Sequence, residues 1–79
     1  MIPVGARVRC KHEIRVFYGL NQPEDVVPAL SEGVVVYRPQ DEGANTNFEI
    51  GVKWLTAAGE PLHVIEVLEN EVDVIGGPT

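Results

Sequence analysis

Phe48-Glu49-Ile50-Gly51-Val52-Lys53-Trp54-Leu55 is the stretch of sequence that decides the fold. Its side chains alternate with a period of two, as they do in a strand with one buried face. Valine, isoleucine and tryptophan fit a pleated surface better than a helix. The stretch therefore predicts a half-buried β-strand, with Trp54 as the largest contributor to the core. The buried face is expected to hold Phe48, Ile50, Val52 and Trp54.

Other short runs on both sides of this stretch show similar patterns, bounded by glycine, proline or asparagine. In the first, Val8 and Cys10 should face the core, while Arg7, Arg9 and Lys11 face outward. The alternation resumes over residues 14–18, where Ile14 and Val16 share the inner side and Phe17 falls on the outer side. Besides residues 48–55, the predicted main strands cover residues 7–10, 34–37, 62–67 and 72–75.

The segments between the predicted strands contain the residues that favour loops and turns. Residues 20–30 contain Asn21, Pro23 and Pro28, which predict a long loop pinned to the core by its apolar side chains. Residues 39–47 are polar and rich in turn formers, and residues 68–71 suggest one 3-10 turn. We therefore expect an all-β fold: a small SH3-like barrel of about five strands, with a long first loop and a 3-10 turn before the last strand. Residues 1–75 should form one domain and residues 76–79 a flexible tail.

Charge is distributed unevenly along the 79 residues, whose formal net charge is −6. From Pro39 onward Lys53 is the only basic residue, against eight acidic ones. This balance argues against nucleic acid as a partner, because phosphate binding needs a basic surface. The basic residues near the start could instead orient an acidic protein. They are Arg7, Arg9, Lys11 and Arg15.

Residue types that carry chemistry are few. The single cysteine, Cys10, together with His12 and His63, does not reach the ligand set that zinc or an iron–sulfur cluster requires. No phosphate-binding loop, nucleophile elbow or Ser-His-Asp order occurs, and the acidic run from Glu66 to Asp73 is interpreted as a solvated face. The sequence therefore predicts no enzyme, no catalytic residue, no metal and no cofactor.

The cellular location is predicted from two features that the sequence lacks. The first seven residues lack the apolar segment of a signal peptide. No apolar run approaches the ~20 residues that a membrane-spanning helix needs. We expect a cytoplasmic protein without membrane contact.

Short motifs follow one another in a fixed order from about Val4 to Ile75. They are Val4-Gly5-x-Arg7-Val8-Arg9, Ile14-x-Val16-Phe17-Tyr18, Pro23-Glu24, Glu32-Gly33-x-Val35, Val52-Lys53-Trp54, His63 and Glu71-Val72-x-x-Ile75. Taken in this order, the motifs resemble the variable subunit of ferredoxin–thioredoxin reductase.

The resemblance implies a non-catalytic chain that supports an iron–sulfur redox partner in electron transport, as a monomer or a hetero-oligomer. The chain departs from the family in its longer segment between Trp54 and His63 and in its acidity. Apolar partner contact is expected from a groove on the barrel. The groove residues would be Phe17, Tyr18, Leu20, Pro23 and Tyr37, beside the basic Arg7, Arg9, Lys11 and Arg15.

Two other functions remain open from the sequence. The aromatic residues of the groove would also suit a peptide- or protein-binding adaptor outside redox metabolism. The charge of −6 on a small domain would suit an acidic inhibitor that mimics nucleic acid. Competition with DNA for a basic protein would identify the inhibitor, and an iron–sulfur partner would identify the redox role.

Overall fold

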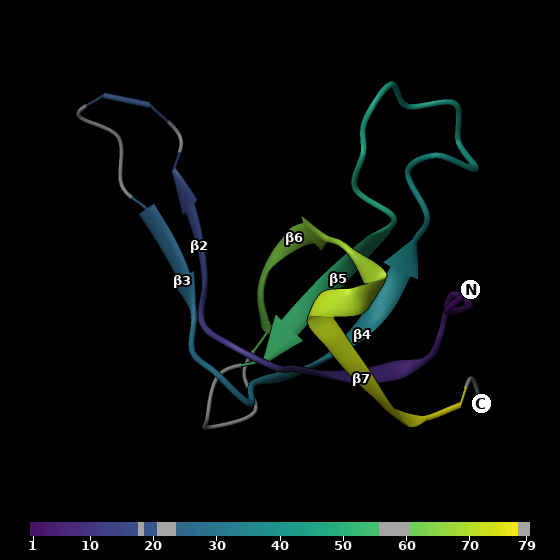
Figure 1. The fold of residues 1–79 in the computed structure, drawn as a ribbon, viewed down its shortest axis with the longest axis horizontal. Helices are drawn as coiled ribbons and strands as arrows, with labels where there is room; N and C mark the ends of the chain where they lie inside the picture. Colours follow the sequence, from purple (N-terminus) through teal and green to yellow (C-terminus); the bar gives the residue numbers. More distant parts are fainter. Residues whose placement is uncertain (18, 21–23, 56–60, 78–79) are drawn as a thin grey trace.

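Seven strands and one 3-10 turn make up the described part of the chain (Figure 1). The computed structural model describes residues 1–17, 19–20, 24–55 and 61–77. The elements are β1 (Arg7–Cys10), β2 (Ile14–Phe17), β3 (Glu24–Val27), β4 (Glu32–Tyr37), β5 (Ile50–Leu55), β6 (Pro61–Val67), η1 (Glu69–Glu71) and β7 (Val72–Gly76). The all-β prediction and the 3-10 turn before the last strand are confirmed. A helix long and apolar enough to cross a membrane is absent from the described residues.

The strands form a five-stranded sheet and a separate hairpin. The sheet has the order β6-β5-β4-β1-β7, and β2 pairs with β3. All pairings are antiparallel. The predicted closure into a barrel is wrong, because the two sheets are not joined and β6 and β7 remain the ends of the larger one. The interior is covered instead by Ile14 and Val27, the buried side chains of the hairpin.

β3 corrects the prediction of a long loop over residues 20–30. Its two acidic residues and the flanking prolines disfavour a strand locally, but pairing with β2 outweighs this preference. The register places Ile14 opposite Val27 and Phe17 opposite Glu24. Val27 is fully buried, whereas Leu20 and Leu30 are exposed and do not pin the segment to the core.

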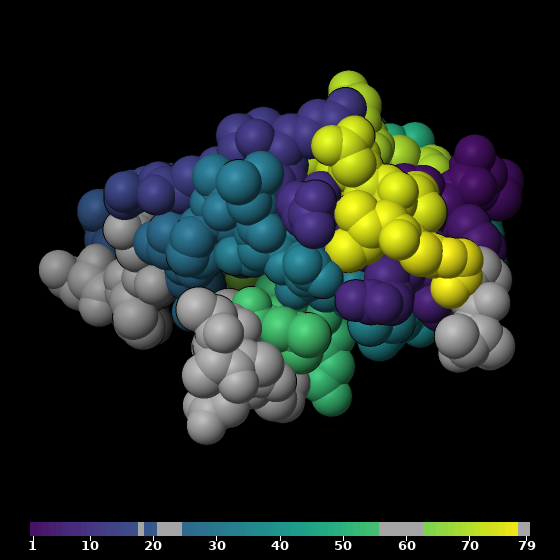
Figure 2. All heavy atoms as spheres, turned by 90° about the horizontal axis from the view of Figure 1, so that it is seen from below, coloured from purple at the N-terminus to yellow at the C-terminus, as the bar shows by residue number. Residues whose placement is uncertain are grey.

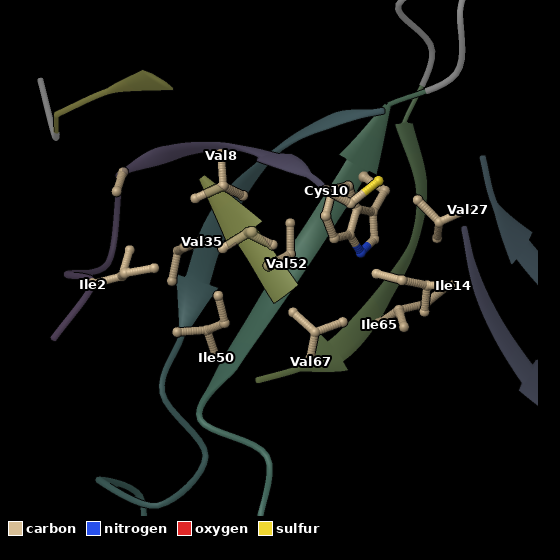
Figure 3. Packing of buried hydrophobic residues seen from close by; sticks show 13 residues of the cluster. Ile2, Val8, Cys10, Ile14, Val27, Val35, Ile50, Val52, Ile65 and Val67 are labelled. Carbon is tan, nitrogen blue, oxygen red and sulfur yellow. The ribbon is translucent and has the colours of Figure 1, made fainter. Parts of the chain in front are cut away.

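The core follows the alternation of the three central strands (Figure 3). Ile50, Val52 and Trp54 of β5 are fully buried, as predicted, and so are Val8 and Cys10 of β1. Phe48 was expected on the same face, but β5 begins only at Ile50 and the Phe48 side chain is exposed. The alternation therefore predicted the strand correctly and its start two residues too early.

The acidic run near the end of the chain is only partly a solvated face. Glu66 accepts a hydrogen bond from the Tyr37 hydroxyl, and Glu71 accepts one from the backbone N–H of Leu68. The Glu69 carboxylate lies against Arg38 and is largely covered. Only Asp73 is well exposed within this group. Carboxylates beside backbone donors and a guanidinium gain hydrogen bonds that compensate for lost water.

Arg38 and Glu69 form a clasp on the N-terminal segment. Nη1 of Arg38 donates to the carbonyl of Ile2 at 2.7 Å, and the N–H of Ile2 donates to Glu69. Nη2 of Arg38 lies 3.5 Å from Glu69 Oε1, and its Nε lies 3.2 Å from Asp41 Oδ2. The Arg38 side chain is only 12% exposed. The clasp thereby holds Ile2, whose side chain belongs to the core, against the end of β4.

Replacing Arg38 with methionine should lower the free energy of unfolding by about 2 kcal/mol. The change leaves the Ile2 carbonyl and a largely covered Glu69 carboxylate without their charged donor, while methionine retains most of the apolar stem. Urea denaturation measures the difference. Arg7→Met is the matched control, because the exposed pair between Arg7 and Glu32 should be worth less than about 1 kcal/mol. Equal losses in both variants would contradict the role of the clasp.

Candidate functional site

The β2–β3 hairpin is the part of the described chain that stands furthest from the five-stranded sheet (Figure 1). Its base is anchored by Ile14 and Val27, which belong to the core, with Val16 packed against them. Its far end carries two large apolar side chains in water, with Phe17 73% exposed and Leu20 94% exposed. An exposed phenylalanine and an exposed leucine at the end of a projecting hairpin are suited to contact with another protein.

Two residues of the predicted site, Tyr18 and Pro23, lie outside the described residues. The structure therefore places only part of the proposed groove. Of the residues it places, Phe17 ends β2, and Leu20 follows it at the same end of the hairpin.

Tyr37, the third residue of the groove that is placed, lies elsewhere. It ends β4 in the five-stranded sheet, and Figure 1 shows the ends of β4 and β2 well apart. Its ring covers Gly51 on the next strand, where a Cβ would come within 2.6 and 2.8 Å of the ring atoms Cε1 and Cε2. Its hydroxyl donates to Glu66 Oε2 at 2.6 Å. Phe17 and Tyr37 therefore do not line one groove, because Tyr37 is engaged by β5 and β6.

The surroundings of Tyr37 change its acidity. The hydrogen bond to Glu66, then burial and the nearby charges of Glu66 and Glu42, raise the pKa of Tyr37 to about 12 from an ordinary 10.0. Ionising the phenol would break the hydrogen bond and place two negative charges side by side.

The pKa of Tyr37 gives the fold a dependence on alkaline pH. Since the pKa is higher in the folded state, the folded protein holds the phenolic proton more tightly than the unfolded chain does. This contribution to stability is complete below pH 10 and is lost as the pH rises from 10 to about 12. Urea denaturation at several pH values should show a smaller alkaline loss for Tyr37→Phe than for the parent. Glu66→Gln should move the phenol titration, followed by ultraviolet absorbance, back toward 10. An unchanged titration would contradict the assigned cause.

The four basic residues of the predicted site each have an acidic partner. Nη2 of Arg7 and Nη2 of Arg9 approach the two carboxylate oxygens of Glu32 at 3.3 and 3.4 Å. Lys11 lies 3.8 Å from Asp73, and Arg15 lies 2.6 Å from Glu13. All four side chains point outward, as predicted, but an acidic partner would have to compete with these carboxylates.

Cys10 faces the core, as the sequence predicted, whereas His12 lies at the surface. The Cys10 thiol is buried and donates to the carbonyl of Pro28 at 3.1 Å. His12 is exposed, with Nδ1 2.9 Å from the carbonyl of Glu13 and Nε2 3.8 Å from Glu71. In the described part of the chain, no three histidine, cysteine, aspartate or glutamate side chains are close enough to hold a metal ion.

Leu30 lies at the surface, although the sequence predicted that it packs on the core with the other apolar residues of the segment 20–30. It follows Pro28 and Ala29 in the turn between β3 and β4, has φ of 68°, and is 66% exposed. A leucine in the left-handed region is uncommon, since the Cβ crowds the backbone there. No local sequence signal distinguishes it from a leucine that packs inward.

No protein-family model matches this chain, and no curated protein or solved structure is significantly similar to it.

Proposed function

We propose that this protein is a non-catalytic docking module that binds another protein through the end of its β2–β3 hairpin. The observation that supports the proposal is the exposure of Phe17 and Leu20 on an element that projects from the sheet. Large apolar side chains are the residues that contribute most to protein interfaces when they enter a pocket of the partner. Their desolvation would give the binding free energy that the paired charges around β1 do not readily supply.

The partner that the sequence resemblance favours is an iron–sulfur redox protein of the kind found in ferredoxin–thioredoxin reductase. In such a complex the partner would carry the cluster and the redox chemistry, and this chain would support it. The buried Cys10 is the only cysteine of the chain, which agrees with a supporting role. A cytoplasmic setting, with its reduced thiols, belongs to the same proposal.

Co-expression with a ferredoxin–thioredoxin reductase catalytic chain from the same genome tests the proposal. The expected result is a complex that runs as one species in size-exclusion chromatography and retains the iron–sulfur absorbance. Leu20→Asn and Phe17→Ser should each weaken this complex about tenfold or more. Leu30→Asn is the matched control, because it removes an exposed leucine at the opposite end of β3.

Two outcomes would contradict the proposal. One is failure of the two chains to associate when both are folded. The other is equal weakening by Leu20→Asn and Leu30→Asn, which would assign the contact to a surface other than the end of the hairpin.

A further inference from the structure

β7 forms one end of the five-stranded sheet. It pairs with β1 on one side, and no described strand pairs with its other side. Its atoms lie at the surface of the molecule, coloured yellow in Figure 2. An open edge of this kind presents backbone groups to which another extended segment can bind.

The pattern of hydrogen bonds shows which residue of β7 offers its backbone. The N–H of Lys11 donates to the carbonyl of Glu71 at 2.9 Å. Because bonded and non-bonded pairs alternate in an antiparallel ladder, the next bonded pair is Arg9 with Asp73. The backbone groups of Val72 and Val74 then point away from β1. The N–H of Val72 is bound by the carbonyl of Glu69, which leaves Val74 with both groups toward the open edge.

The exposure of the Val74 side chain also indicates an open edge at this residue. Val74 lies opposite Val8, and opposed residues of a ladder share one face of the sheet. Val8 is fully buried, so Val74 belongs to the core face, yet it remains 52% exposed. Val72, one pair along and opposite Cys10, is buried. The core face is therefore left uncovered at Val74, the last residue of β7 before its register against β1 shifts, and a further strand paired here would cover it.

Charges on the outer face indicate what that strand carries. Glu32 of β4 lies opposite Arg9 of β1, and Arg9 lies opposite Asp73 of β7. The row thus alternates in sign across three strands and ends on the negative Asp73, which is 66% exposed although Lys11 Nζ lies 3.8 Å from its carboxylate. Opposite charges on facing residues stabilise strand pairing, and like charges oppose it. A basic residue fits the next position, and a second copy of this acidic chain fits it poorly.

We propose that the open edge of β7 binds an extended segment of a partner protein that adds a sixth strand to the sheet. The segment carries lysine or arginine opposite Asp73 and an aliphatic residue opposite Val74. Its backbone bonds to the N–H and carbonyl of Val74, and its aliphatic side chain covers the exposed part of the core face. This site is separate from the hairpin and stands whether or not the hairpin binds a partner.

Titration of the isotope-labelled protein with the blocked peptide Val-Lys-Val-Lys-Val-Lys, followed by NMR, tests the proposal. Shift changes should concentrate on β7 and β1, and hydrogen exchange at the Val74 amide should slow. The matched peptide Val-Glu-Val-Glu-Val-Glu should bind at least about fivefold more weakly, because its charge opposes Asp73.

Two variants and a control variant separate strand addition from simple charge attraction. Val74→Pro removes the outward N–H without removing a bond to β1, and should abolish binding of the lysine peptide. Asp73→Asn should weaken binding about fivefold, whereas Glu42→Gln, which removes the same charge from the β4–β5 loop, should not. If Val74→Pro does not fold, the comparison of Asp73→Asn with Glu42→Gln and the hydrogen-exchange rate of the Val74 amide still test the proposal.

Several results would overturn the proposal. They are shift changes centred away from β7, equal binding of the two peptides, and equal effects of Asp73→Asn and Glu42→Gln. Dimerisation of the protein through β7 without peptide would also overturn it, since the occupant would then be a second copy.

Discussion

Trp54→Ala should lower the free energy of unfolding by about 3–5 kcal/mol, enough to leave a domain of this size largely unfolded. Trp54 is fully buried and lies in the middle of the sheet, opposite Gly33 of β4. Alanine would leave a large cavity bounded by two strands, and strands held in a ladder cannot move together to fill it. Circular dichroism and urea denaturation would measure the loss.

Trp54→Phe should behave very differently, with a change of no more than about 1 kcal/mol. Among the described residues the indole Nε1 is buried without a hydrogen-bond partner. Phenylalanine loses some packing but also removes this unpaired N–H, and the two effects oppose each other. A loss with phenylalanine as large as that with alanine would show that the indole nitrogen does have a partner in solution.

Gly33→Ala should lower the free energy of unfolding by about 2–3 kcal/mol, although it adds only one methyl group. A Cβ at Gly33 would lie 2.6 Å from Val52 Cγ1, 2.8 Å from the carbonyl oxygen of Lys53 and 3.1 Å from Trp54 Cε3. The oxygen belongs to the backbone of β5 and cannot move without breaking the pairing of β4 with β5. Chemical denaturation would report the destabilisation.

Gly77→Ala is the control for this prediction, because a Cβ at Gly77 meets nothing within 4 Å. Its effect should stay within about 0.5 kcal/mol. Gly33→Ala in a Trp54→Leu background should remain destabilised, since the contact with the Lys53 carbonyl persists. Full recovery there would assign the strain to the indole ring alone.

The strands that the sequence predicted are those whose own residues carry the pattern. β5 buries Ile50, Val52 and Trp54 while Lys53 is exposed, and β1 buries Val8 and Cys10 while Arg7 and Arg9 are exposed, so both elements could be interpreted before any tertiary contact was known. β3 could not, because two acidic residues and two valines between prolines become a strand only by pairing with β2. Propensity is local, whereas strand pairing depends on residues far apart in the chain.

The candidate site was predictable in part for the same reason. Alternation placed Phe17 on the outer side of β2, and the structure agrees. The prediction that Tyr37 lines a groove together with Phe17 is wrong. The position of Tyr37 over Gly51 depends on the register between β4 and β5, which cannot be derived from the sequence. The partners of Arg7, Arg9 and Lys11 were missed similarly, since Glu32 and Asp73 are distant in sequence and adjacent only in the sheet.

The position of β1 between β4 and β7 has a consequence for synthesis of the chain on the ribosome. β1 pairs on one side with β7, and every other strand of the sheet lies between these two in the chain, so the nascent protein cannot complete its sheet until residues 72–76 have left the exit tunnel. Until then the edge of β1 that pairs with β7 has no partner strand. Cellular chaperones would meet a four-stranded intermediate in which Val8 and Cys10 are not yet covered by β7.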